Sequence, residues 1–259
     1  MQFVTFNIRT EAMSDGVNRF FYRKGLILDE IEKRRPDIIG FQEMKHDMNS
    51  FMREHLSRMG YTMVGGGRGA DYMGEHNPVA FDSGKYELLG LDTSWLSDTP
   101  YVPGSRYEKQ SSCPRIVTHL MLRPLGEGEP FHVYNTHLDH EQAFARVMGA
   151  KRVMEKIRED LKVWNLPLLL CGDFNAYPDS EEVTYIRNHP LGLTELTGGI
   201  GTTWHNWGRG SDPQIDYIFV KGFDMQGKAC KWDQELNGIY LSDHYPISVE
   251  VSRSDGGAL

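Results

Sequence analysis

The sequence lacks the cysteine pattern of a disulfide-stabilised or zinc-binding protein. Its 259 residues include only three cysteines, Cys113, Cys171 and Cys230, which are widely spaced and form no Cys-x-x-Cys pair. An odd number of distant cysteines argues against a disulfide framework and against a zinc knuckle. We therefore expect reduced and mostly packed thiols.

Long hydrophobic runs are also missing. The longest, such as Leu166 to Cys171, are far too short to cross a bilayer, and no basic segment followed by an apolar stretch opens the chain. This predicts a cytoplasmic protein without a membrane partner. Removal of a leader stays open, because Phe3 already belongs to an apolar run.

Positive charge is scarce. The chain has 28 Lys and Arg against 36 Asp and Glu, a net charge of −8. Proteins that wrap long nucleic acid usually carry a clustered basic face, because phosphate neutralisation supplies most of their affinity. Long duplex DNA is therefore disfavoured as a partner. A small phosphorylated ligand stays compatible with this charge, since two or three local arginines can bind it.

Two catalytic motifs are absent as well. No Gly-x-Ser-x-Gly occurs, which argues against a serine hydrolase. The densest glycine cluster, at residues 65–69, lacks the Lys-Ser/Thr ending of a phosphate-binding loop. We expect this cluster to form a mobile surface loop.

The sequence does contain many strand-forming segments. Apolar and β-branched runs separated by turns predict strands near residues 3–6, 37–41, 78–81, 115–122, 131–136, 167–171, 215–220 and 247–251. Strands outnumber helices and do not alternate regularly with them. This pattern favours an α/β sandwich of mixed sheets over a doubly wound nucleotide-binding sheet.

Two amphipathic helices are predicted between these strands. The first spans about residues 23–34 and is stopped by Pro36. The second spans about residues 141–162, with Met154 and Ile157 on its apolar face, Phe144 beside them and Lys156 pointing elsewhere. Because hydrophobic and charged residues make up ordinary fractions, 39% and 25%, we expect one globular domain over residues 1–259.

An acid and an amide follow the predicted strand at residues 167–171. Asp173 and Asn175 lie two positions apart in Gly-Asp-Phe-Asn, and side chains at such spacing in an extended chain face the same way. A carboxylate and an amide aimed at one point can hold a water or a phosphoryl oxygen. A structural turn would instead use these groups on its own backbone.

Other polar residues stand at strand ends. Asp243 and His244 precede the last strand and offer a hard oxygen ligand beside a group that can carry a proton near neutral pH. Asp216 begins another strand and can pair with an imidazole. Asn7, Glu43 and His137 each end a strand and are weak signals when taken singly; they are Asn7 of Thr-Phe-Asn, Glu43 of Gly-Phe-Gln-Glu and His137 of Asn-Thr-His.

Taken in order, these segments resemble the endonuclease/exonuclease/phosphatase superfamily with its deoxyribonuclease I-like fold. Each motif is short, but six in family order are specific, and they span nearly the whole chain. Further stretches look like the bacterial metal-dependent hydrolase branch, which is also similar to deadenylase-type exonucleases: Glu75-His76-Asn77-Pro78, Ser94-Trp95-Leu96-Ser97 and Cys113-Pro114-Arg115. The resemblance implies a four-layer sandwich of two mixed sheets flanked by helices, with the active site at one edge.

The resemblance also implies roles for these residues. Asn7, Glu43 and Asp243 would form a site for Mg²⁺ or Mn²⁺, which suit hard oxygen ligands better than zinc does. Asp173 would orient or deprotonate the attacking water, and Asn175 would donate to the phosphoryl oxygens. His244, held by Asp216, and His137 would stabilise the transition state.

Several residues are candidates for binding the substrate. Arg115 and Arg68 can pair bidentately with a second phosphate or another anion, as can Arg146 and Arg23, although a surface ion pair is the preferred interpretation for Arg146. Trp204 can stack on a base or sugar, or pack against the core. His76, in a predicted loop, is a weak candidate for reaching the phosphate.

The function expected from these residues is divalent-metal-dependent hydrolysis of a small or short phosphoester by direct water attack. A nuclease on single-stranded RNA or DNA is the alternative. A third hypothesis places zinc at His137-Leu138-Asp139-His140, but Asn135 stands where the first histidine of that motif belongs. A binding module that has lost its chemistry is disfavoured because all six motif positions are chemically competent. The sequence leaves the oligomeric state open.

Overall fold

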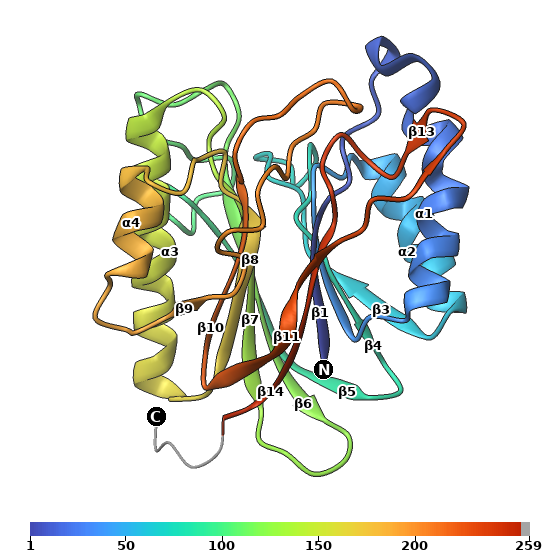
Figure 1. The fold of residues 1–259 in the computed structure, drawn as a ribbon. Coiled ribbons are helices and arrows are strands. Elements are labelled where there is room, and N and C mark those ends of the chain that lie inside the picture. The colour runs from blue at the N-terminus through green and yellow to red at the C-terminus, as the bar shows by residue number, and fades with distance from the viewer. Residues whose placement is uncertain (255–259) are drawn as a thin grey trace.

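Two six-stranded β-sheets form the centre of the molecule in the computed structural model, and helices cover their outer faces (Figure 1). In Figure 1, α1 (Phe20–Arg34) and α2 (His46–Arg58) flank one sheet, and α3 (Ala143–Val163) and α4 (Glu181–Arg187) flank the other. The structure describes residues 1–254, so residues 255–259 of the expected domain lie outside it. The predicted four-layer α/β sandwich is confirmed.

The first sheet is mixed. Its strand order is β11-β14-β1-β2-β4-β3, in which only β1 and β2 are parallel and the other neighbours are antiparallel. The strands are β1 (Gln2–Asn7), β2 (Ile38–Gln42), β3 (Tyr61–Val64), β4 (Val79–Asp82), β11 (Phe223–Lys231) and β14 (Ile247–Arg253). A short 3-10 helix, η1 (Met13–Asn18), follows β1 before α1 begins.

The second sheet repeats this plan with order β5-β6-β7-β8-β10-β9, in which β7 and β8 are the parallel pair. Its strands are β5 (Tyr86–Trp95), β6 (Ile116–Pro124), β7 (Phe131–His137), β8 (Leu168–Asp173), β9 (Thr194–Glu195) and β10 (Asp216–Lys221). A separate hairpin joins β12 (Glu235–Leu236) and β13 (Ile239–Tyr240).

All eight predicted strands are present, whereas the edge strands β3, β5 and β11 and the helices α2 and α4 were not predicted. β5 escapes prediction because it lies at a sheet edge, where Leu89 and Leu91 remain exposed. α2 does carry a usable signal: Met48, Met52 and Leu56 recur every four residues and are buried.

The long helix α3 differs in detail from its prediction. Phe144, expected beside the apolar face, is exposed. Lys156, expected to point elsewhere, is buried and its Nζ lies 2.7 Å from Asp160 and 3.0 Å from Asp92. A lysine that finds two carboxylates can be buried despite its charge, and hydrophobic periodicity does not reveal such partners.

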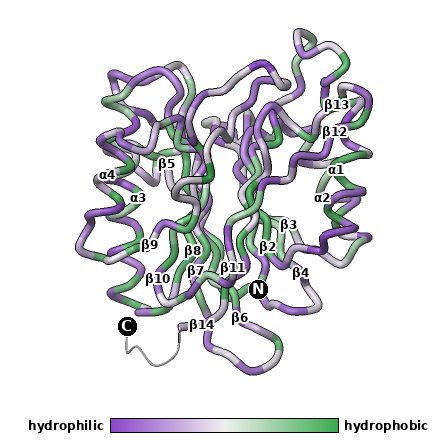
Figure 2. The backbone as a smooth tube through the Cα atoms, viewed as in Figure 1, coloured by the Kyte–Doolittle hydropathy of each residue, from purple (hydrophilic) through white to green (hydrophobic). Residues whose placement is uncertain are grey.

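Three apolar clusters hold the layers together. One fills the space between the sheets, with side chains such as Phe3 and Val133, and the others lie beneath α1 and α2 and beneath α3 and α4. Figure 2 shows the corresponding hydrophobic colour along the central strands. Each sheet is therefore buried on both faces, which explains the nearly continuous apolar runs at residues 38–41 and 168–171.

A polar seam crosses between the sheets just below the functional edge. Gln42 Nε2 donates to Asn135 Oδ1 at 2.7 Å, and Asn135 Nδ2 donates to the carbonyl of Phe41 at 2.7 Å. Gly40 permits this close approach, because a Cβ there would collide with the Cys171 sulfur. Gln42 and Asn135, which belong to two of the six motifs, thus fix how the sheets meet.

The register of the strands brings the polar strand ends to one edge. β1 and β2 run together and end at Asn7 and Gln42, while β7 and β8 end at the paired residues His137 and Asp173. Antiparallel β10 starts at the same edge, with Asp216 opposite Asp173. Residues more than 200 positions apart therefore meet there.

Two expectations about surface and thiols can be compared with the structure. All three cysteines are free, but Cys171 is buried while Cys113 is half-buried and Cys230 is exposed, so the expectation of mostly packed thiols was wrong for Cys230.

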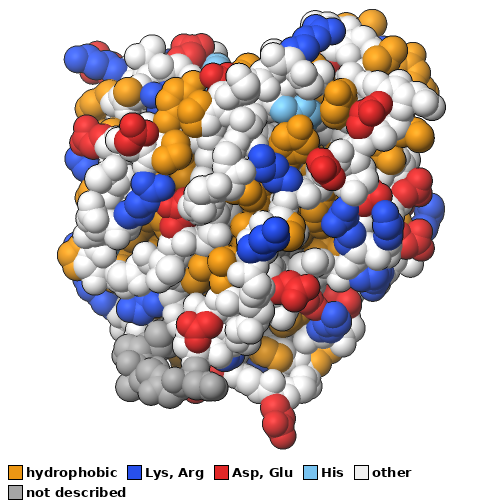
Figure 3. Space-filling model, viewed as in Figure 1, with side chains coloured by type: hydrophobic (Ala, Val, Ile, Leu, Met, Phe, Trp, Pro, Cys, Tyr) orange, Lys and Arg blue, Asp and Glu red, His pale blue; other side chains and the backbone are white. Residues whose placement is uncertain are grey.

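Within residues 1–254, no helix has both the length and the apolar character needed to cross a membrane. On the face shown in Figure 3, acidic and basic side chains are interspersed.

Candidate active site

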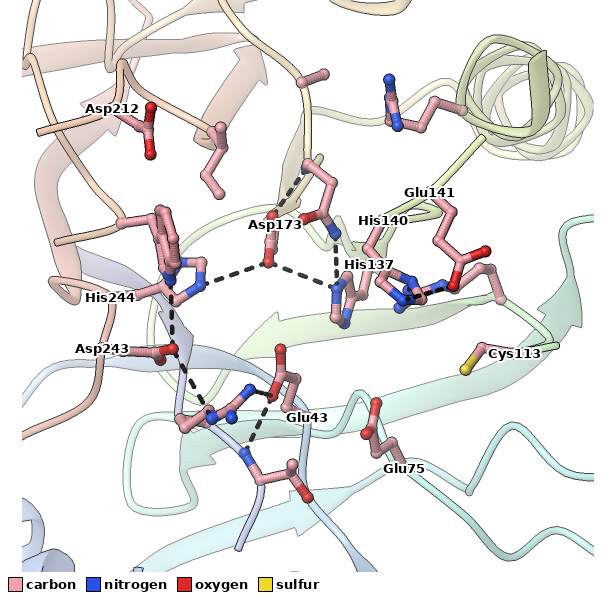
Figure 4. Close-up of a pocket in the computed structure, with 18 of the residues that line it drawn as sticks. Glu43, Glu75, Cys113, His137, His140, Glu141, Asp173, Asp212, Asp243 and His244 are labelled. Carbon is pink, nitrogen blue, oxygen red and sulfur yellow. Dashed lines mark hydrogen bonds and ion pairs between the residues drawn. The ribbon is translucent and has the colours of Figure 1, made fainter. Parts of the chain in front are cut away.

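A cavity of about 630 Å³ opens at the edge where the strand ends meet. Most of the predicted catalytic and metal-binding side chains line it: Glu43, His137, Asp173, Asn175, Asp243 and His244. Figure 4 shows Asp173 at the centre, with Asp243 and His244 on one side and His137, His140 and Cys113 on the other. Asn7 and Asp216 lie directly behind this wall and contact its residues.

Asn7 joins two of the carboxylates. Its Nδ2 donates to Glu43 Oε1 at 3.0 Å and to Asp173 Oδ2 at 2.8 Å, and its Oδ1 accepts from the Arg9 backbone N–H at 2.9 Å. In this arrangement the amide nitrogen, and not the oxygen, faces the carboxylates. Asn7 therefore positions Glu43 and Asp173 relative to each other.

Glu43 is held ionised in a strained turn. Burial would raise the pKa of this carboxyl, but the hydrogen bond from Asn7, the charge of His244 and the Thr10 N–H outweigh that effect and keep the pKa below its usual value. The backbone of Glu43 has a φ of 64°, and Arg9 and Asn175 also adopt positive φ, at 56° and 49°. Such left-handed conformations in residues other than glycine concentrate at functional sites.

Asp173 occupies the centre of the cluster. Its Oδ1 accepts from the Asn175 N–H at 2.8 Å, which is the turn-forming use of the motif, while Oδ2 faces Asn7 and lies 3.5 Å from His137 Nε2. Burial and the nearby charge of Asp216 raise the pKa of Asp173 to about 7. Just before it, Gly172 has no alternative, because a Cβ there would strike the Thr136 carbonyl.

His244 is the cation of the cluster. Its Nδ1 lies 2.9 Å from Asp216 Oδ2, and Thr203 Oγ1 donates to that same oxygen at 2.7 Å. Burial alone would lower the pKa of His244, but the charges of Asp216 and Asp173 raise it to about 10. Thr203, which sequence reasoning missed, fixes Asp216 and thereby the imidazole.

His137 is the neutral counterpart. Burial, together with the positive charge of Arg115, lowers the pKa of His137 well below its usual value. Asn175 Nδ2 lies 3.0 Å from His137 Nε2 and also donates to the Leu138 carbonyl. The acceptor nitrogen of a neutral ring therefore orients the Asn175 amide at the cavity wall.

Asp243 is surrounded by donors. Trp204 Nε1 donates to its Oδ2 at 3.3 Å, and Arg9 Nε lies 3.8 Å from the same atom. Arg9 also approaches Glu43 at 3.9 Å and is held by Asp15 at 3.1 Å. Arg9 was missed because its position depends on Asp15, which no strand pattern indicated.

The far side of the cavity is lined by arginines. Arg115 is buried, with NH2 2.9 Å from His140 Nδ1 and Nε 3.9 Å from Asp139 Oδ2. Arg68 pairs with Glu75 at 2.8 Å, and Arg146 pairs with Glu182 at 2.6 Å. Arg146 forms the expected ion pair, but it faces the cavity, as do the predicted residues Arg68, Arg115 and Trp204.

A family model described as the endonuclease/exonuclease/phosphatase family matches residues 4–244, almost the whole distance from the first strand to His244. The chain belongs to this family. The match includes every motif that carried the resemblance, and so the superfamily inferred from the sequence is confirmed.

Solved structures and curated relatives agree with this membership. A mannosyl-6-phosphatase from Bacteroides thetaiotaomicron is 26% identical with a TM-score of 0.88, and the match covers 97% of this chain and 99% of that one. Nocturnin of Rattus norvegicus is 26% identical over 210 residues, covering 72% of this chain and 46% of the relative. The probable RNA exonuclease NGL3 of Saccharomyces cerevisiae is 25% identical over 181 residues, covering 65% of this chain. The chain spans about half the length of nocturnin and 34% of the exonuclease.

Two predicted substrate residues are not brought to the cavity of this endonuclease/exonuclease/phosphatase family member. His76 is buried, and its Nδ1 lies 3.0 Å from the Gly74 carbonyl and 3.2 Å from that of Met44. Arg23 is fully buried and donates to four backbone carbonyls, those of Ile8, Arg9, Asn18 and Leu241. The hydrogen bonds of both side chains stabilise the loops around the site. Neither residue lines the cavity.

The glycine cluster also differs from its prediction. Backbone hydrogen bonds link Gly67 to Tyr72 and Gly69 to Met73, at 3.1 and 2.8 Å. The segment therefore forms a loop held by backbone hydrogen bonds, and this loop places Arg68 at the cavity. No local pattern in the sequence indicates these backbone partners.

Buried acidic and histidine side chains at the site could hold a metal ion. Among residues 1–254, two groups of ligand-bearing side chains converge: Glu43, His137 and Asp173; and Asp173, Asp216 and His244. Of the predicted ligands only Glu43 belongs to one of these groups, and Asp243 belongs to neither. Asp139 and His140 are also outside them: Asp139 accepts hydrogen bonds from Ser111 and from the N–H groups of Glu141 and Gln142, and His140 is exposed. The buried carboxylates fit a divalent ion, which would relieve the repulsion that raises the pKa of Asp173.

Proposed function

We propose that this protein hydrolyses a phosphoester of a small or short substrate by direct attack of water, with Mg²⁺ or Mn²⁺ as cofactor. The observation that carries the proposal is the convergence of three carboxylates and two differently charged histidines at one open edge of the sandwich. Anionic esters resist a nucleophile until donors and a cation neutralise them. This edge supplies both kinds of group.

Each residue has a part in this mechanism. Glu43 and Asp243 would hold the metal ion, which would neutralise the phosphoryl charge. Asn7, whose Nδ2 donates to Glu43 and Asp173 and whose Oδ1 accepts from the Arg9 N–H, would have to turn its amide to add Oδ1 as a ligand. Asp173, whose pKa of about 7 suits a general base, would accept a proton from the attacking water as its oxygen bonds to phosphorus. The bond from phosphorus to the leaving oxygen breaks, and that oxygen takes a proton from solvent. No covalent intermediate is needed.

The remaining polar residues act on the phosphoryl group. Asn175 Nδ2, whose two hydrogens face His137 Nε2 and the Leu138 carbonyl, would turn one of them toward a phosphoryl oxygen when the substrate binds. Protonated His244 donates from Nε2, which lies 3.8 Å from Asp173 and so beside the attacking water. Asp216 keeps this imidazole protonated and oriented through Nδ1. His137 stays neutral and orients Asn175.

A small or short substrate is favoured by the size of the cavity and by the net charge of −8. The similarity to a mannosyl-6-phosphatase supports the same choice. The alternative is an exonuclease on single-stranded RNA or DNA, which the similarity to a probable RNA exonuclease supports. Long duplex DNA fits neither proposal. We also propose that the protein acts in the cytoplasm.

The test compares three substrates under one set of conditions. A model phosphomonoester, a model phosphodiester and end-labelled oligonucleotides are incubated with EDTA, Mg²⁺, Mn²⁺ or Zn²⁺. We expect hydrolysis of the small esters with Mg²⁺ or Mn²⁺ and none with EDTA. Processive shortening of the oligonucleotide at low enzyme concentration would establish the exonuclease instead, and activity with zinc alone would contradict the proposed donor set.

A further inference from the structure

We propose that the arginine side of the cavity is a subsite for a second phosphate group, so that the substrate carries two phosphates. This inference rests on the proposed function, because it takes the Asp173 side as the place where the first phosphate is hydrolysed. The subsite is built by Arg115, with Arg68 and Arg146 beside it. Its ligand is a phosphate joined to the reacting phosphate by a short spacer.

The first observation concerns the unpartnered donors of Arg115. This side chain is 4% exposed, and its Nε and NH1 atoms have no hydrogen-bond partner among the described residues. Its closest carboxylate, Asp139, lies at 3.9 Å and is already used by Ser111 and by the backbone N–H of Gln142. A buried cation without hydrogen-bonded anions is costly, so a bound anion would gain what the protein does not supply.

Arg23 gives a comparison within the same molecule. It is equally buried, yet its guanidinium donates to four backbone carbonyls, which accounts for its place in the structure. Within residues 1–254, the His140 ring is the only hydrogen-bond partner of Arg115, and that ring is itself exposed at the cavity rim. The fold therefore uses Arg23 as a support and leaves Arg115 free for a ligand.

The neighbours of Arg115 add charge and define the chemical class. Arg68 and Arg146 line the same cavity and raise the local positive charge, although Glu75 and Glu182 each pair with one of them. Burial lowers the pKa of Arg115, and the nearby positive charge of Arg68 lowers it further. A guanidinium fork binds phosphate or carboxylate bidentately, and the unpartnered Nε and NH1 of Arg115 offer more donors than one carboxylate oxygen can use.

The Asp173 side and the arginine side of the cavity lie on either side of His137. His137 stands between Asp173 and the arginines, since it contacts Asp173 and its pKa is lowered by Arg115 after burial. In Figure 4, His140 and Cys113 lie opposite Asp243 across Asp173. A molecule with a phosphate at each end of a short spacer would place one phosphate at Asp173 and the other at Arg115, which line the same cavity.

The experiment uses matched ligands that differ by one phosphate. Binding of 1,4-butanediol bisphosphate and of butyl phosphate is measured by calorimetry in Mg²⁺ on an Asp173→Asn background, where the proposed metal is present and the proposed hydrolysis does not proceed. We expect the bisphosphate to bind at least about tenfold more tightly. In Arg115→Met the ratio should fall below about threefold, because the bidentate partner is gone.

Two further variants control for folding and charge. Arg123→Met removes an exposed arginine from the far end of the same strand, where it pairs with Glu87, and should leave the ratio unchanged. Arg115→Lys keeps the charge without the fork and should give an intermediate ratio. The thermal midpoint of each variant is measured alongside.

Three outcomes would overturn the subsite. These are equal affinity of the Asp173→Asn protein for both ligands, an unchanged ratio in Arg115→Met, and equally tight binding of 4-(phosphonooxy)butanoate, which carries a carboxylate in place of the second phosphate. The proposed function is judged separately by turnover with Mg²⁺ or Mn²⁺. Binding that depends on Arg115 without any turnover would sink the hydrolysis and keep the subsite.

Discussion

The two sides of the cavity manage buried charge in opposite ways. Around Asp173, carboxylates crowd together and share one protonated imidazole, that of His244, so that negative charge is in excess. On the Arg115 side, Arg68 pairs with Glu75 and Arg146 pairs with Glu182. The Nε and NH1 atoms of Arg115 have no hydrogen-bond partner among the described residues. A side with excess negative charge attracts a metal ion, and a side with an unpaired cation attracts an anion.

This difference separates the chemistry from the choice of substrate. Changes on the Asp173 side should lower turnover of every substrate, because they affect the reacting phosphate itself. Changes on the Arg115 side should alter the preference among substrates, because they affect a group that does not react. The following variants test that division, beginning with the largest expected effect.

Asp173→Asn removes the proposed base while keeping the size of the side chain. We expect kcat on every substrate to fall by about 10³-fold or more. The thermal midpoint should stay equal or rise, because a buried carboxylate near Asp216 is neutralised. Turnover of a model phosphomonoester is the measurement, with the exposed Asp224→Asn as the matched control. Near-normal turnover in Asp173→Asn would refute the mechanism.

Glu43→Gln tests the metal-binding part of the same side. Loss of a hard anionic ligand should weaken Mn²⁺ binding by about 100-fold, and high Mn²⁺ should restore part of the activity. Calorimetric titration with Mn²⁺ measures the affinity. Glu54→Gln, an exposed change on α2, serves as the control and should bind Mn²⁺ as the wild type does. Equal affinity in the two variants would remove Glu43 from the metal site.

Asp216→Asn tests what keeps His244 protonated. Burial lowers the pKa of His244 and the charge of Asp216 raises it, with a net value of about 10 against 6.5 in the unfolded chain. Because the folded pKa is raised, this stabilisation is complete below pH 6.5 and is lost as the pH rises to about 10. In Asp216→Asn that loss should be much smaller, and turnover near neutral pH should drop by about tenfold.

Urea unfolding of EDTA-treated protein between pH 6 and pH 10 measures this effect. The free energy of unfolding of the wild type should decline across the range more steeply than that of Asp216→Asn. Parallel curves for the two proteins would show that Asp216 does not set the charge of His244.

Arg68→Gln should have the smallest effect. Its guanidinium already has a partner in Glu75 at 2.8 Å, and its side chain is 15% exposed, so a ligand gains less from it than from Arg115. We expect KM for a bisphosphate substrate to rise by about two- to fivefold with kcat unchanged. A loss as large as that of Arg115→Met would show that both arginines hold the second phosphate equally.

The sequence predicted the strands and the residues at their ends because both depend on local patterns. The buried run before Asp173 and the polar pair Asp243-His244 could be recognised without knowing their neighbours. The order of the six motifs then indicated the family, and the family implied the four-layer form of the sandwich that the strand pattern already favoured. The structure brings these residues to one edge because parallel and antiparallel partners share that edge.

The parts that escaped prediction depend on distant partners. Arg9 takes its position from Asp15, and Thr203 reaches Asp216 from a loop that carries no regular pattern. His76 was expected near the phosphate, but its ring nitrogen is used by the Met44 and Gly74 carbonyls. Hydrogen bonds of this kind join segments with no common periodicity, so a single sequence does not display them.

The left-handed backbone at Arg9 and Glu43 affects how this protein can be engineered. Each such residue costs roughly 1–2 kcal/mol relative to a conformation that its side chain prefers, and glycine or asparagine would remove most of that cost. A laboratory selection for heat resistance alone would therefore enrich these replacements and delete the Glu43 carboxylate. Variants selected for heat resistance must therefore also be screened for turnover, because a stabilising replacement at Glu43 would remove a proposed metal ligand.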